Sequence, residues 1–433
     1  MLIAYLAQPF LFPLQGNALA ANLNVVAPPR TPASSSFFFR LVEDLGNSLE
    51  PTETQLQTLE RSYTSTGRYL SECDEFAGEL IEIHPHGSRQ LGTITRPLRN
   101  RDGFDIDLVA RFDQKAWATY SGNNGATLLL NRLHAAVSRY AQQHGLKLQK
   151  WERCVTLEYA DGMCADIAPV IDHPHYGALH GELHGQIPDR ELKNFLPTNP
   201  RGFTKYFNKL AEISPNFVAT EALKSEAYDH VRRADVVPLA DPDEVFGRLL
   251  CRLVQILKLH RDVAFSASPE LADLAPSSIF LTVLAAESYG LQAPMPHTDP
   301  VHLFLSIIET MPSVIDRTPI WGGETWTVDN PTAPGDNLAN AMNIKEKQQA
   351  FTQWHRRLHS DITSIVTAID GRQGADKVAD LVKAAFGERA NGATRRSQVD
   401  RAAAARSIGK VGAVTAAGII LPMSAKANTF FGQ

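Results

Sequence analysis

The sequence predicts an α+β fold in which a β-rich lobe carries the candidate functional residues and a longer helical lobe follows it. Alternating apolar residues in Leu80–Ile83, Phe104–Phe112 and Cys154–Val170 predict strands in the first lobe. After Pro188 the apolar residues recur at helical spacing instead. With 433 residues, of which 44% are hydrophobic, the chain has enough apolar material for two or three structural units.

Changes in composition divide the chain into four parts. The first part carries few charges before the first regular helix, and the last part is rich in arginine and alanine. We therefore expect a disordered or loosely attached leader (1–36), a β-rich lobe with the site (37–187), a helical lobe that completes a cleft (188–386) and a basic tail of small residues (387–433).

The leader resembles an export signal only in part. Leu2–Leu14 is apolar, and Ala18–Ala21 offers small residues for cleavage. However, Lys and Arg are absent before Arg30, and Pro9 and Pro13 interrupt the apolar run. Elsewhere no run reaches the roughly 18 to 20 apolar residues needed to span a bilayer. We therefore expect a cytoplasmic protein without a membrane partner, whose first residues are a leader or lie upstream of the true start.

Helix signals and turn residues place the other elements. Pro51 separates two amphipathic helices, and Thr52 or Thr54 caps the second of them. Asp161 and Gly162 mark the turn of a hairpin. The predicted helices are Phe37–Leu49, Glu53–Cys73, Asn131–His144, Thr204–Glu212, Pro242–Arg261, Ser277–Tyr289, Val301–Thr310 and Ile344–Ile369.

Asp105 and Asp107 are the candidate metal ligands. Because side chains alternate along a strand, both carboxylates project from one face while Ile106 and Leu108 point into the core. An Asp-x-Asp pair alone is more often a solvated face, but its apolar flanks make this strand half-buried. Two carboxylates this close repel each other, and a divalent cation relieves the repulsion. Oxygen ligands of this kind suit Mg²⁺ or Mn²⁺, which also bind substrate phosphates.

Gly87 and Ser88 precede this strand and complement it. A glycine lets the backbone approach a phosphate closely, and a serine offers both its hydroxyl and its N–H. Together with the two aspartates, the pair predicts metal-dependent nucleotidyl transfer.

Asp166 is the candidate third carboxylate. The segment Cys154–Val170 reads as a hairpin, and Asp166 lies in its second strand between two apolar residues, where an unpaired charge is costly. Glu158 and Asp161 are rivals for this role. Asp161 is better explained by the turn, and Glu158 by an outward position on the first strand.

The helical lobe offers groups that could hold a triphosphate. Lys258 lies near the end of a predicted helix, although a lysine on a helix usually extends to solvent. Pro276, Ser277 and Ser278 open the next helix, at the end that favours anions. The net charge of −5 gives no general attraction for polyanions, so any recognition of phosphate must be local.

Several segments together carry a family resemblance that covers roughly residues 37–370. They are the helix with Gln55, GSRQLGTITRPL before FDIDLV, CADIAPV, NPRGFTKYF at Asn199–Phe207, the helix with Lys258 and Arg261-Asp262, SSIFLTVLAAESY, and WTVDNPTAPGDNL at Trp326–Leu338. The sequence resembles the bacterial cGAS/DncV-like nucleotidyltransferases, or CD-NTases, of the polymerase-β-type nucleotidyltransferase superfamily. The Gly-Ser and Asp-x-Asp core is shared by the whole superfamily, whereas the later segments narrow the resemblance.

The resemblance implies a fold and a reaction. The fold would be a polymerase-β-like catalytic lobe around a small twisted mixed sheet, with the nucleotide cleft between it and the helical lobe. Ribonucleoside triphosphates, ATP or another, would be joined into a cyclic di- or trinucleotide with release of pyrophosphate. The implied roles are two Mg²⁺ (or Mn²⁺) ions bound by Asp105, Asp107 and Asp166, donor phosphates held by Gly87 and Ser88, and a triphosphate faced by Lys258, Ser277 and Ser278.

The resemblance also implies partners. Bacterial members act in anti-phage signalling, in which the product activates a separate effector. In many such systems an accessory conjugation-type or HORMA-type protein acts on the enzyme, and the C-terminal tail is the candidate docking segment here.

Ile279 departs from the animal relative, cyclic GMP-AMP synthase, which has a base-stacking aromatic residue after its two serines. The chain also lacks the zinc-binding insertion and a long basic face, so no double-stranded DNA activator is expected. The residues leave open the bases, the linkage and the ring size. They also leave open a linear oligonucleotide synthase, transfer to another acceptor, and a catalytically silent regulatory relative, although three retained carboxylates argue against the last.

Overall fold

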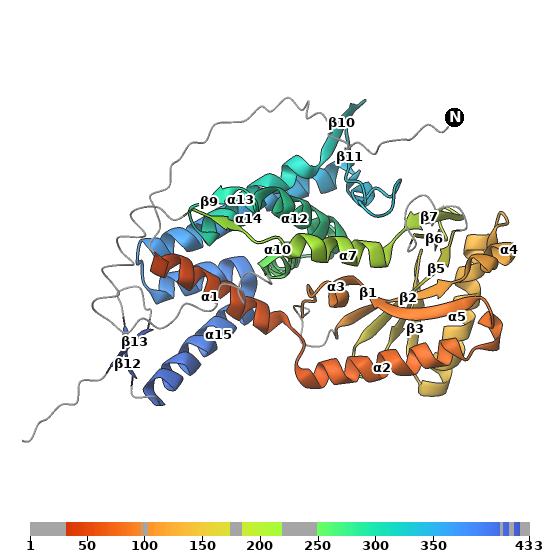
Figure 1. Cartoon of the computed structure of the whole chain (residues 1–433), viewed down its shortest axis with the longest axis horizontal. Helices are drawn as coiled ribbons and strands as arrows, with labels where there is room; N and C mark the ends of the chain where they lie inside the picture. The colour runs from red at the N-terminus through yellow and green to blue at the C-terminus, as the bar shows by residue number, and fades with distance from the viewer. Residues whose placement is uncertain are drawn as a thin grey trace, which may run out of the picture.

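The computed structural model describes residues 32–96, 98, 103–173, 184–218, 249–407, 410–414 and 420–424. These residues form two lobes that lie side by side, each with its own hydrophobic core (Figure 1). Residues 1–31 of the predicted leader and residues 425–433 of the predicted tail lie outside the described part of the chain.

The first lobe is built on a mixed sheet with the strand order β1-β2-β5-β4-β3, to which β6 and β7 are added beside β5. β2 and β5 pair in parallel, and the other neighbours are antiparallel. This sheet confirms the predicted α+β fold class. Its strands are β1 (Leu80–His86), β2 (Asp105–Phe112), β3 (Lys147–Lys150), β4 (Val155–Glu158), β5 (Cys164–Asp172), β6 (Gly185–Asp189) and β7 (Asn194–Thr198).

Helices α2 (Glu53–Ser71) and α5 (Gly125–His144) pack against the apolar residues of this sheet. Ile106, Leu108 and Ile167 belong to that core, so the alternating residues of β2 and β5 project from the other face. The helix α2 begins with a capping box, in which the Thr52 hydroxyl accepts the Gln55 N–H and the Gln55 side chain accepts the Thr52 N–H. Thr52, rather than Thr54, is therefore the cap. Two short helices, α3 (Gly87–Gln90) and α4 (Trp117–Tyr120), complete the lobe.

The second lobe is helical. Its core joins apolar side chains from all of its long helices, and no described helix is long and apolar enough to cross a bilayer. Its elements are α1 (Pro32–Leu49), α7 (Pro200–Ala211), β8 (Asn216–Phe217), α10 (Leu249–Phe265), α11 (Pro269–Ala272), α12 (Ser278–Gln292), β9 (Pro296–His297), α13 (Pro300–Thr310), β10 (Asp316–Ile320), β11 (Gly323–Thr327), α14 (Lys345–Asp370), α15 (Ala375–Ser407), β12 (Lys410–Val414) and β13 (Ile420–Ser424).

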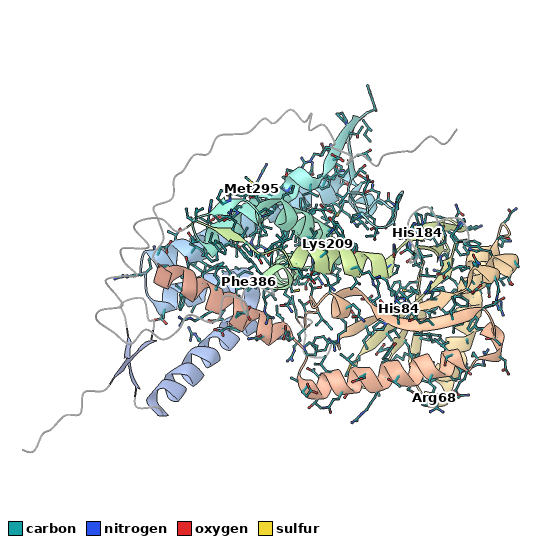
Figure 2. The ribbon with its side chains drawn as sticks, viewed as in Figure 1. Arg68, His84, His184, Lys209, Met295 and Phe386 are labelled. Atoms are coloured by element: carbon teal, nitrogen blue, oxygen red, sulfur yellow. The ribbon has the colours of Figure 1, made fainter. Side chains whose placement is uncertain are left out.

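The helix α7 connects the lobes. Its residues Phe203 and Phe207 lie in the core of the helical lobe, while Arg201 at its first turn donates a hydrogen bond to Glu82 on β1. In Figure 2, the label His84 marks β1 in the first lobe, and the label Lys209 marks the C-terminal part of α7 in the helical lobe.

The predicted N-terminal boundaries differ from the structure. The helix α1 begins at Pro32, inside the segment predicted as a leader. Its apolar residues, including Phe38 and Leu45, pack into the helical lobe, although the sequence prediction placed them in the β-rich lobe. The described part of the chain therefore begins in the helical lobe, crosses to the sheet and returns. Amphipathic spacing shows that a helix has a buried face, but it does not show which core receives that face.

The other two predicted boundaries also fall inside regular elements, β6 and α15. The division at Pro188 lies within β6, because β6 pairs with β5 at Gln186 and Ile171 and along its length with β7. The predicted tail begins at Gly387, where a positive φ of 83° breaks α15, yet the helix resumes and Ala390 is buried in the helical core.

Candidate active site

Three aspartates project from the polar face of two neighbouring strands. Asp107 on β2 lies directly opposite Asp166 on β5, and Asp105 lies opposite Cys164 two pairs away along the strands. The parallel pairing therefore brings together side chains that are far apart in the sequence. Of the two rivals, Glu158 forms an ion pair with Lys147, at 2.9 Å, and Asp161 accepts the N–H of Met163 across the hairpin turn, at 3.1 Å.

Gly87 is required by its contact with Asp107. His86, the last residue of β1, pairs with Asp107, and Gly87 follows with a φ of +64°. A Cβ atom at position 87 would lie 1.7 Å from Asp107 Oδ2, which no side chain can tolerate. The Ser88 backbone N–H donates a hydrogen bond to the same carboxylate. The Gly-Ser pair and the Asp-x-Asp pair thus form one contiguous site.

Burial raises the pKa of Asp107 to about 6, and the charges of Asp166 and Asp105 contribute in the same direction. Lys258 and the Ser88 N–H act against this rise. Burial also raises the pKa of Asp166. Negative charge is therefore held at this face against an unfavourable environment, as is common where carboxylates serve a functional purpose.

Thr156 on β4 holds Asp166. It lies opposite Asp166 in the β4–β5 hairpin, and its hydroxyl donates a hydrogen bond to Asp166 Oδ1. This bond stabilises the charged carboxylate and lowers its pKa, opposite to the effect of burial.

The residues at this face fit a divalent cation that arrives with a substrate. Among the described residues, no three His, Cys, Asp or Glu side chains converge closely enough to hold an ion by themselves. Mg²⁺ usually takes one or two carboxylates, and waters and substrate phosphates complete its shell. Asp107 and Asp166 supply such a pair. The backbone of Gly87 packs against Asp107 so closely that only glycine fits at this position.

Lys258 lies inside the protein rather than in solvent. Only 4% of the residue is exposed, and its Nζ donates hydrogen bonds to the carbonyl of Thr93, at 3.0 Å, and to the Thr93 hydroxyl, at 3.3 Å. Burial lowers the pKa of Lys258 to about 8; Arg261 adds to this effect, and the charge of Asp107 opposes it. The charges of Lys258 in the helical lobe and Asp107 in the other lobe thus favour each other.

Ser277 and Ser278 form the start of α12. The Ser277 hydroxyl caps the helix by accepting the Phe280 N–H, at 3.4 Å, and the Ser278 hydroxyl accepts a hydrogen bond from Arg261, at 3.0 Å. Arg261 also donates to the Pro276 carbonyl, at 3.0 Å. Both hydroxyls are thus used within the protein, and Arg261 brings a second cation to this helix start.

Three side chains near the site were not singled out from the sequence: Thr156, Thr93 and Gln255. Thr156 had a detectable signal, because a hairpin turn at Asp161 places it directly across from Asp166. Thr93 and Gln255 had none, since their contacts join segments about 160 residues apart.

The comparison with known proteins agrees with this geometry. Residues 40–210 match the family described as the Second Messenger Oligonucleotide or Dinucleotide Synthetase domain. A c-di-GMP synthase of Roseivirga ehrenbergii is 27% identical over 351 residues, which cover 79% of this chain and 82% of the relative. The cyclic dinucleotide synthase CdnG of Bradyrhizobium diazoefficiens is 24% identical over 352 residues, covering 78% of this chain and 77% of the relative.

The fold is also shared with a solved structure. The structure of the Bradyrhizobium diazoefficiens CD-NTase CdnG in complex with GTP superposes with a TM-score of 0.58 at 20% identity, covering 83% of this chain and 97% of that one. The chain is thus similar to cyclic dinucleotide synthases over most of its length, and it shares its fold with a CD-NTase.

Proposed function

We propose that the protein joins ribonucleoside triphosphates into a cyclic dinucleotide and releases pyrophosphate. The observation that carries this proposal is the pairing of Asp107 with Asp166, with Gly87 in contact with one side and Lys258 acting from the other lobe. Because both relatives are named for dinucleotide synthesis and the CdnG structure contains GTP, we propose GTP as a substrate and a dinucleotide rather than a trinucleotide as the product.

Different residues of the chain would bind the metal ions and the phosphates. Asp105, Asp107 and Asp166 would hold two Mg²⁺ or Mn²⁺ ions, which stabilise charge on the attacking and leaving oxygens. Gly87 and Ser88 would receive the donor's β- and γ-phosphates. The remaining positive charge comes from the helical lobe, where Lys258, Arg261 and the first N–H groups of α12 would bind the triphosphate while Ser277 and Ser278 shape that helix start.

The reaction follows from these positions. The ribose hydroxyl oxygen of one nucleotide forms a bond to the α-phosphorus of the next, the bond to pyrophosphate breaks, and the hydroxyl proton leaves. A second transfer within the linear intermediate closes the ring. Fixing both nucleotides between two lobes lowers the entropic barrier of each transfer.

Product identity tests the proposal directly. The protein is incubated with all four ribonucleoside triphosphates and Mg²⁺ or Mn²⁺, treated with phosphatase and analysed by mass spectrometry. We expect a guanine-containing cyclic dinucleotide that resists phosphatase. A linear product with phosphatase-sensitive ends would support a linear synthase instead, and the absence of nucleotide turnover would contradict the proposal.

Replacing Thr156 by Val is expected to lower kcat/KM about 10-fold, because a hydrogen bond to a charged group is worth roughly 1.5–3 kcal/mol. Losing this donor raises the pKa of Asp166 further, so the acidic limb of the pH–rate profile should move to higher pH. The Thr156→Ser variant keeps the hydroxyl and serves as the control. Equal activity and equal pH profiles in the Val and Ser variants would show that the Thr156 hydroxyl does not contribute to the site.

We further propose that the protein acts in the bacterial cytoplasm in anti-phage defence, with a separate effector that responds to the product. An accessory conjugation-type or HORMA-type protein would bind the C-terminal segment, of which residues 425–433 lie outside the described part of the chain. The support for both statements is the similarity of the chain to cyclic dinucleotide synthases and its resemblance to the CD-NTases.

A further inference from the structure

One face of α10 holds the segment that follows the Gly-Ser pair. Side chains one turn apart on this helix each donate a hydrogen bond to a backbone carbonyl of residues 91–94. These bonds run from Cys251 Sγ to the Leu91 carbonyl at 3.3 Å, from Gln255 Nε2 to the Ile94 carbonyl at 3.0 Å, and from Lys258 Nζ to the Thr93 carbonyl at 3.0 Å. We call residues 91–94 the strap.

The strap is tied directly to the Gly-Ser pair. The Thr93 N–H donates to the Ser88 carbonyl, at 2.9 Å, and the Leu91 N–H donates to the Gly87 carbonyl, at 3.2 Å. Thr93 is fully buried, with 0% of its surface exposed. A shift of the strap therefore displaces Gly87 and Ser88.

Gln255 is fixed at both ends of its side chain. Its Oε1 accepts a hydrogen bond from Arg252 Nη1, at 2.9 Å, while its Nε2 holds the strap. Arg252 is in turn held by Glu43 of α1, at 3.1 Å, and by Glu50, directly after α1, at 2.7 Å. Gln255 is 0% exposed, and a buried amide that is hydrogen-bonded through both its oxygen and its nitrogen has little freedom to move.

We propose that Gln255 is a positioning residue that sets the place of Gly87 and Ser88 relative to Lys258, an inference that rests on the proposed function. Gln255 and Lys258 lie on the same rigid helix, so one element fixes both the phosphate-facing loop and the phosphate-facing cation. Because α10 belongs to the core of the helical lobe, this contact also fixes the loop of one lobe to the body of the other.

The Gln255→Glu variant separates the two ends of this side chain. It has nearly the same shape and keeps an acceptor for Arg252, but it replaces the N–H that binds Ile94 with an oxygen. Glu43→Gln is the matched control, because it weakens the Arg252 network from α1 without a contact to the strap. A general loss of stability should appear in both variants, and a loss of loop position only in the first.

Two measurements test the proposal. With Mg²⁺ and GTP, we expect Gln255→Glu to raise the KM for nucleotide about 10-fold, the cost of one unsatisfied buried group, with a smaller change in kcat. In protein without nucleotide, hydrogen–deuterium exchange of residues 87–96 should be faster in Gln255→Glu than in wild type. Glu43→Gln should change neither measurement.

Unchanged exchange at residues 87–96 in Gln255→Glu would overturn the proposal, and so would an equal rise in KM in Glu43→Gln. If Gln255→Glu does not fold, Cys251→Ala and Cys251→Ser give a second test. Serine keeps a donor for the Leu91 carbonyl and should retain wild-type exchange, whereas alanine should not. Equal exchange in the two variants would show that α10 does not hold the strap through these side chains. The exchange measurement needs no activity, so failure of wild type to use GTP would refute the proposed function separately.

Discussion

Replacing Asp105 and Asp107 together by Asn is expected to abolish nucleotide incorporation while the protein remains folded. The loss should exceed about 1,000-fold, because stabilisation of the transition state by bound metal is worth several kcal/mol. The measurement is product formation by mass spectrometry, beside thermal unfolding with and without Mg²⁺. Wild-type turnover in the double variant would show that these carboxylates are not the metal site.

The pKa of Asp107 gives this variant a further signature. In the folded protein the pKa is raised to about 6 from a usual value of 3.8, so the folded state binds this proton more tightly than the unfolded state. The stability of the metal-free protein should therefore fall as pH rises from about 4 to about 6 and stay reduced above that range. Asn carries no such charge, so the double variant should be at least as stable as wild type at pH 8 without metal. Mg²⁺ should raise the Tm of wild type only.

Replacing Lys258 by Ala is expected to raise the KM for nucleoside triphosphate about 10- to 100-fold, with a smaller effect on kcat. A fixed charge near the triphosphate contributes ground-state binding, and roughly 1.4 kcal/mol corresponds to a factor of ten. Steady-state kinetics with GTP check this result. Lys377→Ala, which removes an exposed lysine of α15, is the matched control and should leave KM unchanged.

The pH dependence separates the charge of Lys258 from its structural bond to Thr93. The pKa of Lys258 is lowered to about 8, so its ammonium loses the proton as pH rises through that value. In wild type, kcat/KM should therefore fall above about pH 8, whereas the Ala variant should lack this limb. Since the folded state binds this proton less tightly than the unfolded state, stability itself should rise between about pH 8 and pH 10.5. If kcat/KM of the Ala variant also falls above about pH 8, the fall arises from another group.

Local sequence patterns predicted the strands and the face on which the aspartates lie, and two particular segments show why. The alternation in Asp105–Val109 placed both aspartates on one face before any tertiary contact was known, and the turn at Asp161 defined the β4–β5 hairpin. The same turn implied that Thr156 faces Asp166, which follows from counting pairs outward from the turn.

Other features were not accessible to this reasoning. The prediction ended the β-rich lobe before Pro188 because helical spacing dominates after it. However, β6 contains this proline, at a position where pairing with β5 has already stopped. The helix α1 was assigned to its neighbour in sequence rather than to the core on which it packs. In both cases the deciding contact is with a residue distant in the chain.

The sequence by itself determined the same-face geometry of Asp105 and Asp107 and the start of α12 at Ser277 and Ser278, because each depends on neighbouring residues alone. Only the tertiary structure decided that Asp107 meets Asp166, since that contact arises from parallel pairing of β2 with β5, between which α4, α5, β3 and β4 lie in the sequence. The tertiary structure also decided that Lys258 is buried. A lysine on an isolated helix extends to water, and this one is buried because the strap from the other lobe covers it and supplies a carbonyl for its ammonium.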